Sequence, residues 1–130
     1  MIDYLTVIYK NYDLLYLQLD NFKRMFPDRD YRLIVVDNTP DIEKKNIERK
    51  DEIDMIIEME SLPNTFDGIS HGGALDASLS HCKSDIVCIF DSDFFFLDKN
   101  LNNYIREKFA SGYVAVGTEW DDGLGTSPWV

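Results

Sequence analysis

Short, continuous apolar runs alternate along the chain with longer segments whose apolar residues recur every three or four positions. The continuous runs are typical of strands covered on both faces, and the wider spacing is typical of helices with one buried face. The pattern predicts strands at residues 5–9, 33–36, 53–59, 86–90 and 113–116. It predicts helices between Asn11 and Pro27 and at residues 41–52, 70–81 and 98–110, the second of these short and highly charged.

The first helix has the clearest amphipathic pattern. Its apolar positions form one stripe at spacings of four, three and four: Leu15, Leu19, Phe22 and Phe26. Asn11 or Asp13 is suited to cap its start, and Pro27 cannot continue it. We expect this stripe to pack against the sheet.

Strands and helices alternate with short connections, which favours a mostly parallel sheet with helices on both faces. We therefore expect an α/β fold with a Rossmann-like sheet, formed by residues 1–130 as a single domain. Strand 86–90 is expected near the centre, and strand 53–59 at an edge because acidic residues interrupt it. Ligands of such sheets bind beyond the carboxyl ends of the strands.

Composition narrows the function classes. The chain has 130 residues, 24 acidic and 13 basic, a net charge of −11, and 45% hydrophobic residues. This apolar content suits a folded core, and the acidity argues against nucleic acid or an anionic membrane as the main partner. It is compatible with an anionic ligand held through a divalent cation. No apolar run approaches the roughly 20 residues that span a bilayer.

Cys82 and Cys88 fit no zinc-binding spacing. We expect two reduced, packed thiols in a cytoplasmic protein, with a disulfide as the alternative. The segment that begins at Met1 has no basic region of the kind that opens a signal peptide.

The strongest candidate for chemistry is a pair of acidic residues after strand 86–90. On an extended backbone, Asp91 and Asp93 face the same side, and a cation between them would relieve their repulsion. Hard ions such as Mg²⁺ or Mn²⁺ prefer carboxylate oxygens and keep positions open for substrate phosphates. The alternative is a solvated turn whose aspartates bond to nearby backbone amides.

Other polar residues follow neighbouring predicted strands. Asp37 and Asn38 end strand 33–36, so Asp37, Asp91 and Asp93 are expected to converge on one ligand. Gly72 and Gly73 are predicted in the first turn of helix 70–81, where a ligand can approach the backbone closely.

Four segments together resemble nucleotide-sugar glycosyltransferases of the GT-A fold, in the broad family-2-like group. They are TVIYKNY at 6–12, IVVDNTPD at 34–41, HGGALD at 71–76 and IFDSD at 89–93. The resemblance covers residues 5–116, and the last segment is similar to the family's DxD motif. It implies a metal-dependent enzyme that binds a nucleoside-diphosphate sugar and transfers the sugar to an acceptor.

The resemblance implies a role for each matching residue. Asp37 would read the nucleotide base with Asn38 beside it, and Tyr9 would line the base pocket. Asp91 would contact the ribose and the water shell of the metal. Asp93 would be the direct ligand of Mn²⁺ or Mg²⁺, a Lewis acid for the departing nucleoside diphosphate. Gly72 is placed by the same resemblance among the nucleotide-sugar-binding residues.

The chain also departs from the family pattern. The basic contact to the diphosphate, usual in the helix before the DxD motif, is replaced by Leu75-Asp76-Ala77-Ser78. His71 or Lys10 is a candidate substitute, with a surface or capping histidine as the alternative for His71. Phe94, Phe95 and Phe96 are expected to pack in the core.

The acceptor-binding part is expected to be reduced or missing, because the chain ends soon after the last predicted strand. Glu119, Asp121 and Asp122 are the candidate general bases there, with a solvated acidic loop as the alternative. Trp120 and Trp129 are candidates for stacking on a sugar.

Two other functions compete with glycosyl transfer. A haloacid-dehalogenase-like phosphohydrolase also carries Asp-x-Asp after an apolar strand, but Phe95 stands where that class has Thr or Val. The other is a nucleotide- or metal-binding module without turnover. The acceptor (glycan, lipid or protein) and the oligomeric state stay open.

Overall fold

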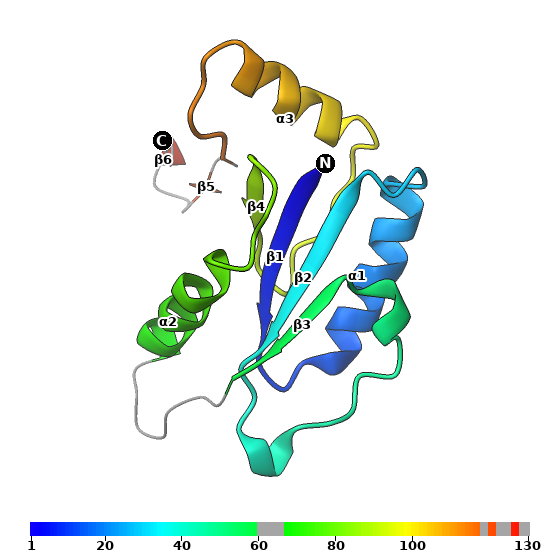
Figure 1. The fold of residues 1–130 in the computed structure, drawn as a ribbon, viewed down its shortest axis with the longest axis vertical. Coiled ribbons are helices and arrows are strands. Elements are labelled where there is room, and N and C mark those ends of the chain that lie inside the picture. Colours follow the sequence, from blue (N-terminus) through cyan, green and yellow to red (C-terminus); the bar gives the residue numbers. More distant parts are fainter. Residues whose placement is uncertain (60–66, 118–119, 122–125, 128–130) are drawn as a thin grey trace. The chain divides into compact units, whose positions relative to one another are not determined.

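The computed structural model describes residues 1–59, 67–117, 120–121 and 126–127, with the backbone alone at 67–70, 120–121 and 126–127. Two compact units are present, Met1–Leu97 and Asp98–Val130, and each is described by itself. Figure 1 shows the elements of both. The prediction of a single domain stays a prediction. In the described part of the chain, no helix is both long and apolar enough to cross a membrane.

The first unit is built on a four-stranded, all-parallel sheet with the strand order β3-β2-β1-β4. The strands are β1 (Ile2–Ile8), β2 (Tyr31–Asp37), β3 (Met55–Glu58) and β4 (Val87–Ile89). β1 and β2 are almost entirely buried, as their continuous apolar runs predict. The predicted edge position of β3 is confirmed. β4 lies at the other end of this described sheet rather than near its centre.

Helices α1 (Tyr12–Met25) and α2 (Asp67–Leu79) cover opposite faces of this sheet (Figure 1). Side chains alternate along β1, so Leu5 packs with Ala74 of α2 on one face. Tyr4 on the other face meets Phe22 of α1 edge to face, with ring centroids 5.2 Å apart. The predicted α/β fold with helices on both faces is therefore confirmed.

An aromatic cluster fills the core on the α1 face. Tyr4 lies at its centre with 0% exposure, and its neighbours come from α1, β2 and the chain after β4. These neighbours are Phe22, Phe26, Tyr31, Phe90 and Phe96. The predicted apolar stripe of the first helix thus has its expected role, and Phe96 belongs to the core as predicted. Phe94 was predicted to pack there too, but it lies on the turn after β4 and is 38% exposed, so that part of the prediction was wrong.

The segment at 41–52, predicted as a charged surface helix, instead contains two short 3₁₀ turns, η1 (Asp41–Glu43) and η2 (Lys50–Glu52). The prediction was wrong because the segment buries only Ile47, at 4% exposure, and lacks the apolar stripe that would dock a helix. Side chains of α1 instead form hydrogen bonds with the backbone of the 41–52 segment. The Tyr12 hydroxyl accepts a hydrogen bond from the Lys45 N–H, and the Tyr16 hydroxyl accepts one from the Glu48 N–H.

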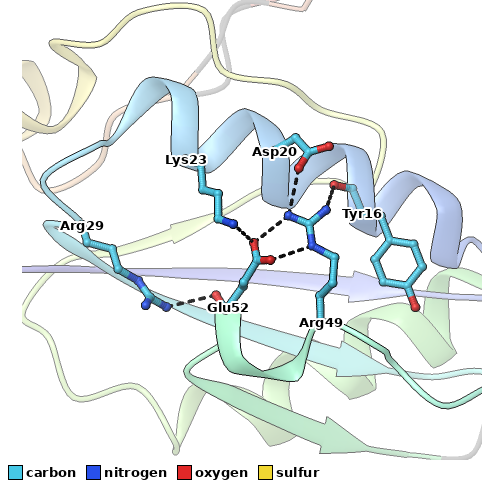
Figure 2. Close-up of polar contacts among 6 residues, drawn as sticks. All are labelled: Tyr16, Asp20, Lys23, Arg29, Arg49 and Glu52. Carbon is cyan, nitrogen blue, oxygen red and sulfur yellow. Dashed lines mark hydrogen bonds and ion pairs between the residues drawn. The ribbon is translucent and has the colours of Figure 1, made fainter.

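An ion-pair network completes this attachment (Figure 2). The Arg49 guanidinium binds Glu52 in a bidentate manner and reaches Asp20 of α1 at 2.8 Å. Lys23, one helical turn along α1, pairs with Glu52 at 3.0 Å. The charges that suggested a solvated helix therefore tie the 41–52 segment to α1.

The second unit contains α3 (Leu101–Ala110) and an antiparallel pair, β5 (Trp120–Asp121) and β6 (Thr126–Ser127). The strand predicted at 113–116 is absent, and the prediction was wrong. The chain turns at Ser111 and Gly112, and the Tyr113 N–H donates back to the Lys108 carbonyl. Residues 113–116 are all exposed, so their apolar run has no buried face on which a strand would pack.

Candidate functional site

The carboxyl ends of β1 and β2 are joined by hydrogen bonds between the segments that follow them. The Asn38 N–H donates to the Ile8 carbonyl at 3.0 Å, and the Lys10 N–H donates to Thr39 Oγ1 at 2.9 Å. The backbone of Lys10 has a φ of 62°, in the left-handed region that residues other than glycine rarely adopt. The two strand ends therefore form one connected rim, as the sheet topology predicts.

Tyr9 and Lys10 lie exposed on this rim. Tyr9 is 47% exposed, and the Lys10 ammonium lies 5.0 Å from the centre of its ring. The same ammonium pairs with Glu43 at 2.8 Å, and the hydrogen bond to that carboxylate raises the pKa of Lys10. Tyr9 is thus a partly exposed aromatic residue at the rim, with the Lys10 ammonium over its ring, where the predicted base pocket would lie.

Asp37, the other predicted base-reading residue, is only 2% exposed. Its Oδ2 accepts the Tyr12 hydroxyl at 2.7 Å, and its Oδ1 accepts the Thr39 N–H at 3.1 Å. Burial, together with the Asp37 carboxylate, raises the pKa of Tyr12. Both carboxylate oxygens are therefore engaged inside the protein, and the adjacent Asn38 is also buried.

The acidic pair lies on a turn. The Phe94 N–H donates to the Asp91 carbonyl at 3.0 Å, so the chain stops being extended at Asp91. The argument that alternation along a strand places Asp91 and Asp93 on one side was therefore wrong. Both side chains are exposed, and between them Ser92 Oγ accepts a hydrogen bond from Asn11 at 2.6 Å. That bond connects the loop after β4 to the chain after β1.

The acidic residues do not form a three-residue cluster. Across the described residues, no three His, Cys, Asp or Glu side chains come close enough together to hold a metal ion. Asp37 therefore does not share a metal site with Asp91 and Asp93, and it is buried with both oxygens bonded. The expected convergence of the three residues on one ligand stays a prediction. The pair alone still fits Mg²⁺ or Mn²⁺, which protein sites often hold through one or two carboxylates plus substrate phosphates. Both carboxylates are exposed, and no other described residue bonds to them.

The glycine pair lies differently from the prediction. α2 begins at Asp67, so Gly72 and Gly73 fall in its second turn rather than its first. An N–H there points along the helix to the carbonyl four residues earlier, which leaves it unsuited to a ligand. A Cβ at either position would meet nothing within 4 Å, and both residues are exposed. His71 is half-buried beside them.

The remaining candidates belong to the second unit. Glu119, Asp122 and Trp129 lie outside the described residues. Trp120 and Asp121 form β5, whose backbone alone is described. Their predicted roles stay predictions.

Sequence reasoning missed two polar residues of α1 that contact the loop of the acidic pair. Gln18 donates to the carbonyls of Asp91 and Phe94, and Asn21 pairs with the backbone of Phe96. A signal existed, since Gln18 lies three residues after Leu15 and four before Phe22, and Asn21 lies four before Met25, on the apolar side of the helix. Polar residues on the packed side of a helix are buried with it, and buried amides need partners.

The sequence model of the family described as Glycosyl transferase family 2 matches residues 5–128. That range includes the second half of β1, all of β2, the acidic pair and α3. No curated protein matches the chain at a significant level.

Several solved structures have a fold similar to that of this chain. The crystal structure of S. aureus TarS has a TM-score of 0.62 and 16% identity over 84% of this chain and 19% of that chain. S. aureus TarS 1–349 in complex with UDP-GlcNAc has a TM-score of 0.58 and 15% identity over 85% of this chain and 31% of that one. The galactosyltransferase LgtC, in complex with donor and acceptor sugar analogues, has a TM-score of 0.51 and 17% identity over 78% of this chain and 41% of that chain. The chain thus spans between about a fifth and two fifths of these proteins.

Proposed function

The chain belongs to glycosyl transferase family 2, and on this basis we propose that it binds a nucleoside-diphosphate sugar and transfers the sugar to an acceptor. The observation that carries the proposal is the family match across both strand ends of the rim and the exposed Asp91 and Asp93. The phosphohydrolase alternative has no support in these comparisons. The cytoplasmic location stays a prediction.

The proposed donor is a uridine nucleotide sugar. Support comes from the similar fold of TarS 1–349, whose structure holds UDP-GlcNAc. In this chain the exposed ring of Tyr9 is suited to contact the base at the rim. Asp37 is proposed to act on the same side indirectly, by fixing Tyr12 and the turn at Thr39, since its own oxygens are already bonded.

The diphosphate is proposed to bind near Asp91 and Asp93 with Mn²⁺ or Mg²⁺. Two exposed carboxylates in an acidic protein would repel a diphosphate unless a cation lay between them. When bound, such a cation stabilises the negative charge that develops on the leaving nucleoside diphosphate. Asp93 is assigned the direct contact and Asp91 the ribose and the water shell. Gly72 is set aside from this proposal because its amide lies inside α2.

Calorimetric titration with UDP, with and without Mn²⁺, tests donor binding. We expect binding that needs the metal and is lost in Asp93→Ala. Asp28→Ala is the matched control, because Asp28 is another exposed aspartate in a turn, after α1 rather than after β4. It should bind UDP like the wild type. Equal UDP binding without any divalent cation would contradict the assignment of the metal.

A turnover assay separates an enzyme from a binding module. We expect the chain to hydrolyse a UDP-sugar slowly or to transfer the sugar when glycan, lipid or protein acceptors are supplied. Glu119, Asp121 and Asp122 are the proposed candidates for the general base, to be replaced one at a time by Gln or Asn. A chain that binds UDP with Mn²⁺ but never releases sugar would be a binding module.

A further inference from the structure

The loop that carries the acidic pair is held by side chains of α1 as well as by its own core residues. Phe90 and Phe96, at its two ends, are 7% and 4% exposed and pack in the aromatic cluster, with their ring centroids 5.3 Å apart. Between them Asp91 and Asp93 are exposed. The position of the carboxylates therefore depends on how the backbone between the two rings is held.

Gln18 holds the first half of this loop. Its Nε2 donates to the Asp91 carbonyl at 3.1 Å and to the Phe94 carbonyl at 3.3 Å. These carbonyls belong to the two end residues of the turn that the Phe94 N–H closes on Asp91. One buried amide, 2% exposed, thus bonds to both ends of the turn that contains the acidic pair.

Asn21 holds the second half. Its Nδ2 donates to the Phe96 carbonyl at 2.9 Å, and its Oδ1 accepts the Phe96 N–H at 2.8 Å. Such a two-bond contact fixes the backbone in both position and direction. Gln18 and Asn21 are three residues apart, so they lie on the same side of α1 and bind consecutive parts of one loop.

Gln18 is an unexpected choice if overall stability is its only role. Its Oε1 is buried and has no hydrogen-bond partner among the described residues. A buried acceptor without a partner destabilises a fold, and an apolar side chain of similar size would remove that cost. The presence of glutamine is therefore better explained by what its Nε2 group holds in place.

We propose that Gln18 and Asn21 are positioning residues that hold the loop from Asp91 to Phe96 so that both carboxylates engage the cation and diphosphate of one donor. This proposal rests on the proposed function. Residues that orient metal ligands through hydrogen bonds commonly change metal affinity by roughly tenfold to a hundredfold when removed. Here the contact is to the backbone of the loop rather than to the carboxylates themselves.

The test compares Gln18→Met with the wild type, since methionine keeps the length of the side chain and removes the amide. The ligands are UDP with Mn²⁺, which needs the acidic pair, and uridine without metal, which does not. We expect UDP–Mn²⁺ affinity to fall about tenfold or more, with uridine affinity unchanged. An equal loss for both ligands, or no loss for either, would overturn the proposal.

Two further variants separate the loss of the hydrogen bonds of Gln18 from a general loss of stability. Gln18→Asn keeps an amide but shortens the side chain by one methylene, and we expect it to behave like Gln18→Met. Ser84→Ala is the matched control, because it removes a 2.7 Å hydrogen bond to the buried Asp3 at the opposite end of β1. It should lower the stability without changing the ratio of the two affinities.

Hydrogen exchange of the Phe94 amide, without ligand, separates this proposal from the proposed function. Faster exchange at this amide in Gln18→Met, but not in Ser84→Ala, supports the role of Gln18 in fixing the turn that the Phe94 N–H closes on Asp91. Unchanged exchange of the Phe94 amide would refute it. If the wild-type protein binds UDP with the same affinity with and without Mn²⁺, that result would refute the proposed metal site instead.

Discussion

The Tyr12 hydroxyl donates a 2.7 Å hydrogen bond to Oδ2 of Asp37, and both side chains are almost fully buried. The Tyr12 hydroxyl oxygen also accepts a hydrogen bond from the Lys45 N–H at 3.1 Å. One phenol therefore connects α1, the end of β2 and the segment that follows β2. The base of the donor is proposed to bind beside these parts of the chain.

Removing that hydroxyl should destabilise the protein. In Tyr12→Phe the buried Asp37 carboxylate loses one partner, which costs about 1–3 kcal/mol. Urea unfolding measures the change in unfolding free energy. Tyr16→Phe is the control, because its hydroxyl accepts the Glu48 N–H at an exposed position and should cost less. Equal losses in the two variants would show that the bond to Asp37 is not special.

Acid should weaken the ion-pair network of Figure 2. The Arg49 hydrogen bonds, with help from Lys23, lower the pKa of Glu52 from its ordinary 4.5 to about 2. Because the folded-state pKa lies below the unfolded one, this stabilisation is present above pH 4.5 and is lost as the pH falls to about 2. It should amount to about 1–3 kcal/mol, measured by urea unfolding across that window.

Glu52→Gln should flatten the fall in stability across the same pH window. Glu48→Gln, at an exposed position four residues earlier, should keep the wild-type slope. If Glu52→Gln kept the slope as well, the network would not be the source of the acid sensitivity.

Neighbouring residues at the end of the acidic loop should respond very differently to truncation. Phe96 is 4% exposed inside the aromatic cluster, whereas Leu97 is 87% exposed. Phe96→Ala should cost about 3–5 kcal/mol of unfolding free energy, since it leaves a cavity in the core. Leu97→Ala should stay within about 0.5 kcal/mol of the wild type. Thermal and urea unfolding of both variants provide the measurement.

The two thiols should be unreactive in the folded protein. Burial raises the pKa of Cys88 to about 11 and raises that of Cys82 as well, so little thiolate exists near neutral pH. Both cysteines are free in the structure, as predicted. A thiol reagent at mildly alkaline pH should label them slowly until urea is added, and Cys88→Ser identifies the slower one. Rapid labelling of native Cys88 would contradict its burial.

Local patterns predicted the parts of the fold that local physics controls. β1 and β2 are read directly from continuous apolar runs, and α1 from the spacing of Leu15, Leu19 and Phe22. The segments at 41–52 and 113–116 were misjudged because neither carries a strong period, so contacts elsewhere decided their conformation. Arg49, for example, reads as a surface charge and in fact binds Asp20 of α1.

The candidate site divides in the same way. The sequence by itself determined that two strand ends carry Asp37 and the pair Asp91 and Asp93, because strand ends follow from the apolar pattern. Only the tertiary structure decided that Asp37 turns inward to Tyr12 while the pair stays exposed. It alone brought Gln18 to a carbonyl 73 residues away in sequence. Such hydrogen bonds depend on how the packed helix and sheet place distant parts of the chain, and no local periodicity encodes that.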